Sequence, residues 1–281
     1  MLLNEYLVPN RIYNRKEPIL FNKHNFTIQE IRSAFPPGKS AFDRENPLGH
    51  FVWRRLSYYV AWLFLRLGVS ANKVTTLAIA IGCIGCLLIA LGFYWSTILG
   101  VLFILLRALL DYADGAIARA TSSTSRFGGY LDTIHHYVIT SLLPIGIGIG
   151  LFNRSDRVLQ IVIQWLFGLD ITRSLFLIVG FSASLLALLT YSISDRFAIS
   201  FSIKPRDFYR PSDSSKRSVW GFIFRVGLIL QNVNGTMMLV LLLAAIFNFL
   251  SIFHVTWLII TTAGFIAITT RTMTRAGKLV K

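Results

Sequence analysis

The sequence predicts an all-α protein that crosses a membrane several times. Of its 281 residues, 54% are hydrophobic and only 15% are charged, and the mean hydropathy is +0.60. A soluble domain carries roughly 25% charged residues. Several windows of about 20 apolar residues can be marked, which is the length that a helix needs to cross a bilayer. The short alternating segments of a membrane β-barrel are not seen, so the windows are expected to be helices.

We expect six transmembrane helices, which together form one domain over residues 74–275. Their apolar windows cover about residues 74–94, 97–119, 128–152, 171–193, 222–250 and 253–270. An even number of crossings leaves both ends of this domain on the same side of the membrane. Pro144 and the glycines that follow it are expected to loosen or kink the third helix.

Two cysteines, Cys83 and Cys86, form a C-x-x-C within the first window. In a soluble protein this spacing would indicate redox chemistry or a metal site. Here the pair alternates with Gly82 and Gly85 in an apolar run. Small residues in such a run favour the close approach of a neighbouring helix, which is the interpretation that we adopt.

The segments outside the predicted bundle are more polar. Residues 1–48 are predicted to be a cytoplasmic N-terminal extension, and residues 276–281 a cytoplasmic tail. Between the extension and the bundle, residues 49–73 mix three arginines with Trp, Tyr, Phe and Leu. This mixture predicts an amphipathic helix that lies in the headgroup plane and leads into the first span.

The formal net charge of +15 comes mainly from Lys and Arg outside the apolar windows, in the N-terminal segment, in a linker over residues 196–225 and in the tail. If these regions share one side, the positive-inside rule places them in the cytoplasm. Their predicted partners are membrane lipids, and nucleic acid is not expected. Lys204, Arg206 and Arg210 are either topology determinants or ligands for an acceptor or lipid phosphate. Arg225, near the start of the fifth window, is better placed to face a cavity.

Three carboxylates, Asp111, Asp114 and Asp132, lie at the ends of the second and third windows. A carboxylate at membrane depth costs about 2.5–3.5 kcal/mol on insertion scales, so a group of them indicates a bound cation or a function. Residues three, four and seven apart share one helix face. Asp111 and Asp114 therefore form one stripe, and Asp132 and His136 form a second on the next helix. We expect the two stripes to converge on one cavity.

Crowded carboxylates favour hard divalent cations with oxygen ligands. Gly115 and Ala118 on the first stripe would let a diphosphate lie against the helix backbone, and Arg119 supplies a planar fork of donors for phosphate or ribose. These residue types point to a site for a nucleotide diphosphate or a lipid diphosphate. The same polar cluster would also suit an ion-coupled transporter, and the residues alone leave both interpretations open.

The run from Asp111 to His136 resembles the signature of the CDP-alcohol phosphotransferase family, D-x2-D-G-x2-A-R-x8-G-x3-D-x3-D. Seven fixed residue types stand at the correct spacing over 26 positions: Asp111, Asp114, Gly115, Ala118, Arg119, Gly128 and Asp132. The resemblance extends over roughly residues 50–275 and also covers the N-x2-T of Asn72 and Thr75. The last position departs from it, because His136 stands where the family has a fourth Asp.

The resemblance implies a site with two divalent cations, Mg²⁺ or Mn²⁺, and a CDP-linked donor. Asp111, Asp114 and Asp132 would hold the metals, and Gly115, Ala118, Arg119 and Gly128 would join the first two carboxylates in contacting the donor. The reaction would transfer a phosphoryl-alcohol group, such as a phosphatidyl group, to an acceptor hydroxyl and release CMP in phospholipid synthesis. The resemblance also implies a homodimer.

The role of His136 stays open at this point. It is a candidate for the general base, since imidazole titrates near neutrality, and for a metal ligand that would favour Mn²⁺ or Zn²⁺. A catalytically impaired relative that binds a CDP-lipid is the third interpretation. The neighbouring His135 is expected to point about 100° away and to serve packing or an interface.

Two other kinds of membrane protein are weighed against this function. An intramembrane prenyltransferase would need a second Asp-rich motif on a later span, and we expect none of the last three spans to contain an Asp. A transporter would carry ionisable residues through the membrane midplane, whereas here they end in the cytoplasmic third. The sequence therefore predicts an integral, multi-pass membrane enzyme whose active site faces the cytoplasm.

Overall fold

The computed structural model describes residues 26–35, 52–154, 161, 164–165, 173–202 and 236–279. Within these residues every regular element is a helix, which confirms the all-α prediction. The helices are α1 Ile28–Ser33, α3 Arg54–Arg66, α4 Ala71–Ala90, α5 Tyr94–Ala120, α6 Arg126–Asn153, α8 Ser174–Ser200, α11 Thr236–Ile246 and α12 Leu250–Leu279.

Five of these helices, α4, α5, α6, α8 and α12, are long and apolar enough to cross a membrane, so the chain is a multi-pass membrane protein. The fifth predicted window corresponds to α11, of which the structure describes 11 residues, so the number of six spans stays a prediction. Both α8 and α12 continue past the apolar windows that predicted them. The end of α12 reaches Leu279, inside the predicted tail.

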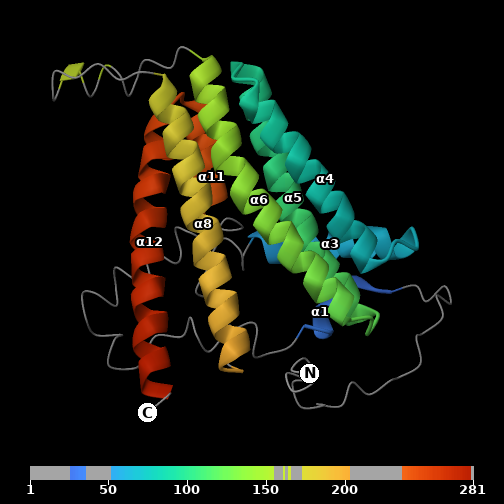
Figure 1. Cartoon of the computed structure of the whole chain (residues 1–281). Coiled ribbons are helices and arrows are strands. Elements are labelled where there is room, and N and C mark those ends of the chain that lie inside the picture. The colour runs from blue at the N-terminus through green and yellow to red at the C-terminus, as the bar shows by residue number, and fades with distance from the viewer. Residues whose placement is uncertain are drawn as a thin grey trace.

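The long helices lie side by side and alternate in direction (Figure 1). α5 packs between α4 and α11, α6 packs against α4 and α8, and α8 packs against α12. The end of α5, the start of α6 and the ends of α8 and α12 consequently lie at the same end of the bundle. The short helices α1 and α3 lie at this end too. We refer to it as the site end, because the acidic residues lie there.

Small residues set the distances between α4, α5 and α6. A Cβ atom on Gly85 of α4 would stand 2.9 Å from the carbonyl oxygen of Gly100 on α5, and one on Gly146 of α6 would stand 2.8 Å from that of Cys86. Both cysteines of the C-x-x-C are free thiols within this contact. The geometry agrees with the packing interpretation of this run. α6 is one helix through Pro144, and the glycines after the proline lie at its contacts with α4 and α8.

The amphipathic helix expected within residues 49–73 corresponds to α3. Ser57, Tyr58 and Ala61 are its buried face, which packs against α5, and Leu56 and Leu63 are half exposed on its other side. Helix α1 lies within residues 1–48, the predicted N-terminal extension. Its first turn is closed by Thr27 and Glu30, which exchange side-chain and backbone hydrogen bonds, and its Ile31 is buried against the same cluster as Tyr58.

Candidate active site

The acidic residues lie on two adjoining helix ends. Asp111 and Asp114 are in the last three turns of α5, and Asp132 is in the second turn of α6. A short turn reverses the chain between the helices. Ser125 then caps α6, because its hydroxyl oxygen accepts a hydrogen bond from the backbone N–H of Gly128 at 3.0 Å. The cap fixes the start of α6 beside the end of α5.

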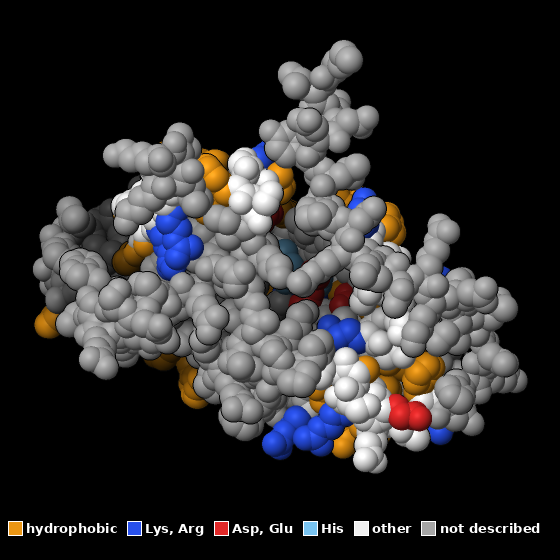
Figure 2. Space-filling model, turned by 90° about the horizontal axis from the view of Figure 1, so that it is seen from below, with side chains coloured by type: hydrophobic (Ala, Val, Ile, Leu, Met, Phe, Trp, Pro, Cys, Tyr) orange, Lys and Arg blue, Asp and Glu red, His pale blue; other side chains and the backbone are white. Residues whose placement is uncertain are grey.

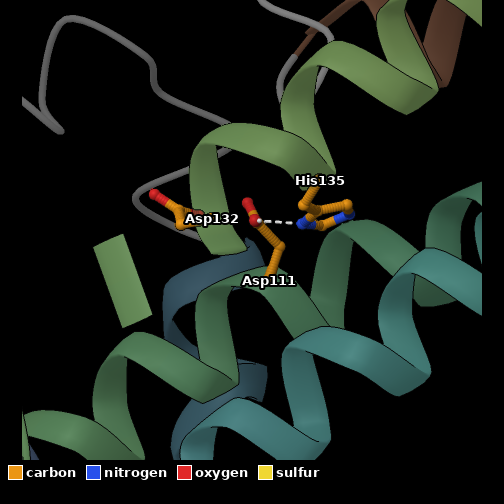
Figure 3. Close-up of side chains that lie close together, drawn as sticks. All are labelled: Asp111, Asp132 and His135. Carbon is orange, nitrogen blue, oxygen red and sulfur yellow. Dashed lines mark ion pairs between the residues drawn. The ribbon is translucent and has the colours of Figure 1, made fainter. Parts of the chain in front are cut away.

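The structure brings Asp111 and Asp132 together, with His135 as their neighbour. One ligand atom from each of these three residues lies within 4.8 Å of the other two. Asp111 points from α5 toward α6, and His135 points from α6 toward Asp111 (Figure 3). Their closest atoms, Asp111 Oδ1 and His135 Nδ1, are 3.1 Å apart.

His136 lies on the more open side of the same group, where a third of its side chain is exposed. Its Nε2 atom is 3.7 Å from Asp132 Oδ1 and 3.9 Å from Asp111 Oδ1. These separations are too long for hydrogen bonds. They match two ligands of one ion, since atoms that each lie about 2.0–2.2 Å from a metal are separated by at most about 4.4 Å. Carboxylates and an imidazole at these distances fit a divalent cation.

Asp114 lies outside this close group and contacts α4 instead. Its side chain is buried, and its Oδ2 atom accepts a hydrogen bond of 2.6 Å from the hydroxyl of Thr75. A buried carboxylate needs such a donor, because water cannot replace it. Asp111 and Asp114 thus lie on one helix, but their carboxylates contact side chains of different neighbouring helices.

The residues expected to contact a donor line the α4 and α5 side of the site. The guanidinium of Arg119 lies over Gly115, where a Cβ atom would stand 3.0 Å from its Nη1 atom, and Ala118 is half-buried one turn along. On α6, a Cβ atom at Gly128 would stand 3.2 Å from Asn72 Oδ1. The lack of a side chain at Gly128 thus lets the start of α4 lie close to the start of α6.

Seen from the site end, acidic side chains and a histidine lie deep in a hollow of the molecule (Figure 2). Lys and Arg side chains lie on the surface around it. A hollow with a negatively charged floor and basic surroundings suits a cation together with an anionic ligand. Lys204, Arg206, Arg210 and Arg225, the candidates for an acceptor phosphate, lie outside the described residues.

The expectation for His135 was incomplete. The side chain is fully buried, as a packing residue would be, but it packs on Asp111 and does not point away from the site. Its ring stacks on that of His136 with 5.5 Å between centroids and 13° between planes. α6 therefore presents a broad face to α5, and two successive side chains reach the same carboxylate.

Sequence reasoning also missed Arg107, one turn before Asp111. Its side chain is fully buried, and its Nε donates a hydrogen bond of 2.6 Å to His135 Nε2. The signal was present, since an arginine inside an apolar window is costly without a partner. The partner could not be named without the register between α5 and α6.

The expectation that the last three spans contain no Asp was wrong. α8 continues to Ser200 and includes Asp195, whose Oδ2 atom accepts a hydrogen bond of 3.0 Å from the hydroxyl of Tyr137 on α6. Hydropathy marks where a window becomes polar, whereas a helix can continue through polar residues to the surface. A single aspartate held by a tyrosine is not the second Asp-rich motif of a prenyltransferase.

Comparison with known families agrees with this geometry. A family model described as CDP-alcohol phosphatidyltransferase matches residues 68–269, a range that includes α4, α5, α6 and every acidic residue of the site. The chain belongs to the CDP-alcohol phosphatidyltransferase family. The predicted resemblance to this family is thereby confirmed.

Three relatives show how far the similarity extends. Archaetidylinositol phosphate synthase of Pyrococcus horikoshii is 36% identical over 91 residues, 32% of this chain and 46% of that protein. Inner membrane protein YnjF of Escherichia coli is 35% identical over 79 residues, 28% and 36% of the two chains. CDP-diacylglycerol–glycerol-3-phosphate 3-phosphatidyltransferase of Blochmanniella floridana is 43% identical over 54 residues, 18% and 28%. The chain spans less than half the length of each of these relatives.

Proposed function

We propose that this chain transfers a phosphoryl-alcohol group, such as a phosphatidyl group, from a CDP-linked donor to the hydroxyl of an acceptor alcohol. The acceptor oxygen attacks the β-phosphorus of the donor, the bond from that phosphorus to the CMP oxygen breaks, and CMP leaves. The product is a phosphodiester of a phospholipid pathway. The observation that supports this most strongly is the convergence of Asp111, Asp132 and His136 in a member of this family.

Asp111, Asp114 and Asp132 are proposed to hold two divalent cations, Mg²⁺ or Mn²⁺. Bound there, the cations would neutralise charge on the leaving phosphate and favour an in-line displacement. The protein contributes the geometry: Asp111 and Asp132 reach one point from two helices, while Thr75 fixes the carboxylate of Asp114.

The donor is proposed to lie along the α5 face that includes Gly115 and Ala118. Asp111 and Asp114 border this face, and Gly128 completes it from α6. Arg119 can swing from its position over Gly115 to offer its fork of N–H donors to phosphate or ribose oxygens. The lack of a side chain at Gly115 leaves room for a bulky diphosphate.

His136 is proposed to act as the general base. Its Nε2 atom takes the proton of the acceptor hydroxyl, and it lies 3.7 Å from Asp132 Oδ1 and 3.9 Å from Asp111 Oδ1. Its partial exposure leaves the ring accessible to an acceptor. A His136 that instead ligates a metal predicts higher activity with Mn²⁺ or Zn²⁺ than with Mg²⁺, so a metal series separates the two roles.

The site is proposed to face the cytoplasm. Most basic residues of the described chain lie at the site end, whereas Arg154 and Arg173 lie at the opposite end. The site-end residues are Arg32, Arg54, Arg55, Arg66, Lys73, Arg119, Arg126, Arg196, Arg271 and Arg275. The positive-inside rule assigns the basic end to the cytoplasm. A homodimer is proposed from the family alone, and chemical cross-linking in native membranes tests it.

Release of CMP tests the proposed function directly. Purified protein in lipid nanodiscs is incubated with CDP-diacylglycerol, Mg²⁺ or Mn²⁺, and a panel of alcohols that includes inositol phosphate, glycerol phosphate and serine. We expect CMP and a new phospholipid with at least one acceptor, and neither product with Asp111→Asn. If the wild type releases no CMP with any acceptor and metal but still binds the donor, the chain is the catalytically impaired lipid-binding relative.

A further inference from the structure

A buried arginine determines how His135 meets the site. Arg107 lies in the middle of α5 with no exposed surface, and its Nε donates a hydrogen bond of 2.6 Å to Nε2 of the equally buried His135. On the opposite side of the same ring, Nδ1 lies 3.1 Å from Asp111 Oδ1. The three side chains thus form a line from the interior of the bundle to the site.

The hydrogen bond from Arg107 fixes which ring nitrogen carries the proton. A guanidinium has only donors and stays protonated in proteins, so the nitrogen that it meets must accept. His135 Nε2 is therefore unprotonated, and the neutral ring carries its proton on Nδ1. The atom that faces Asp111 is an N–H group.

We propose that Arg107 and His135 form a positioning pair for Asp111, in which His135 presents its Nδ1–H to the carboxylate and is not a metal ligand. This inference rests on the metal site of the proposed function. A nitrogen that carries a proton has no lone pair to give to a metal, and the other nitrogen is occupied by Arg107. His135 therefore contacts Asp111 Oδ1, the same oxygen that lies 3.9 Å from His136 Nε2, and fixes the orientation of the ligating carboxylate.

Such a partner behind a ligating carboxylate influences metal binding without touching the metal. Outer partners of metal ligands typically change the metal affinity 10–100-fold when they are lost. Burial strengthens this effect, because water cannot replace the missing donor at Asp111. Arg107 acts one step further away, by keeping the proton of His135 on the side of the carboxylate.

Two substitutions of His135 separate its contact with Asp111 from its contact with Arg107. The amide nitrogen of asparagine occupies roughly the place of Nδ1, so His135→Asn keeps a donor beside Asp111 and loses the contact with Arg107. Glutamine places its amide near Nε2, so His135→Gln keeps an acceptor for Arg107 and loses the donor. His254→Asn is the matched control, because His254 is also fully buried but lies on α12 with its Nε2 3.3 Å from the carbonyl oxygen of Phe176.

Binding of Mn²⁺ to the purified full chain is measured by electron paramagnetic resonance, without donor or acceptor, after size-exclusion chromatography confirms a folded sample. We expect His135→Gln to raise the Kd for Mn²⁺ about 10–100-fold. His135→Asn should stay within about threefold of the wild type, and so should His254→Asn. Equal weakening in His135→Asn and His135→Gln would overturn the positioning role.

A second measurement works even where His135→Gln does not fold. Electron spin echo envelope modulation of bound Mn²⁺ detects the nitrogen of a coordinated imidazole. It is applied to His136→Asp, in which His135 is the only imidazole near the metal among the described residues. We expect no coupling to nitrogen, and a clear coupling would overturn the proposal. A wild type that binds Mn²⁺ but releases no CMP would contradict the proposed function and leave this inference standing, whereas a wild type without Mn²⁺ binding would contradict both.

Discussion

Two fully buried histidines, one in each half of the bundle, have different surroundings. His135 near the site end lies between a guanidinium and a carboxylate, with 2.6 Å to Arg107 Nε and 3.1 Å to Asp111 Oδ1. His254 in the other half has its Nε2 atom 3.3 Å from the carbonyl oxygen of Phe176, in a gap left by Gly148 and Gly180. Burial and residue type are the same. The charge of the partners separates a site residue from a packing residue.

The comparison implies that substitutions near the site should change metal binding and activity, and substitutions in the other half should change stability alone. The largest expected effect is that of Asp111→Asn. The amide keeps the shape of the side chain but removes a charge that two histidines and a metal share, so we expect activity to fall at least about 1000-fold. CMP release measures it. His254→Asn should keep activity within about threefold of the wild type. An equal loss of activity in Asp111→Asn and His254→Asn would show that the two halves of the bundle do not differ in this way.

Thr75→Val is expected to have the next largest effect. Its hydroxyl donates the 2.6 Å hydrogen bond to Asp114, and valine leaves a buried carboxylate oxygen without that donor. We expect the metal concentration for half-maximal activity to rise about 10–100-fold. Thr76→Val is the control, because the hydroxyl of Thr76 is exposed and bonds only to Asn72 of its own helix. A similar dependence of activity on metal concentration in the two variants would show that the hydrogen bond from Thr75 to Asp114 does not affect metal binding.

The sequence was sufficient for the part of the site that depends on helix periodicity. The spacing of Asp111 and Asp114 on one helix and of Asp132 and His136 on the next predicted two facing stripes. The structure brings Asp111 close to Asp132 and His136, whereas Asp114 contacts Thr75 on α4. The bundle followed from hydropathy for the same reason, because a transmembrane helix needs only length and apolar composition. These features are local to one helix or to one turn.

The remaining features depend on how two helices face each other, which periodicity does not supply. The prediction that His135 points away used only the rotation of about 100° between successive residues of an ideal helix. The rotation of α6 instead places His135 on Asp111, and only the register with α5 shows that Arg107 completes the contact. Asp195 was missed because the end of an apolar window is not the end of a helix.

In the other half of the bundle, Gly148→Ala should reduce stability and leave the chemistry unchanged. A Cβ atom there would stand 2.6 Å from the carbonyl oxygen of Phe176, and a backbone atom cannot move aside without shifting α8. We expect a loss of about 1–3 kcal/mol, seen as a lower melting temperature, with unchanged Mn²⁺ affinity. Gly129→Ala at the site end is the matched control, since a Cβ atom there meets nothing within 4 Å. A lower Mn²⁺ affinity in Gly148→Ala would show that the two halves are coupled.

The smallest effect is expected for Tyr137→Phe. This variant tests whether a residue next to His136 in the sequence also takes part in the site. The hydroxyl of Tyr137 donates a hydrogen bond of 3.0 Å to Asp195 on α8. Loss of this half-buried hydrogen bond should cost about 1 kcal/mol of stability. Activity should stay within about threefold with every acceptor. A loss of activity with one acceptor alone would instead show that Tyr137 and Asp195 line the acceptor site, so that proximity in sequence to His136 reflects a shared function.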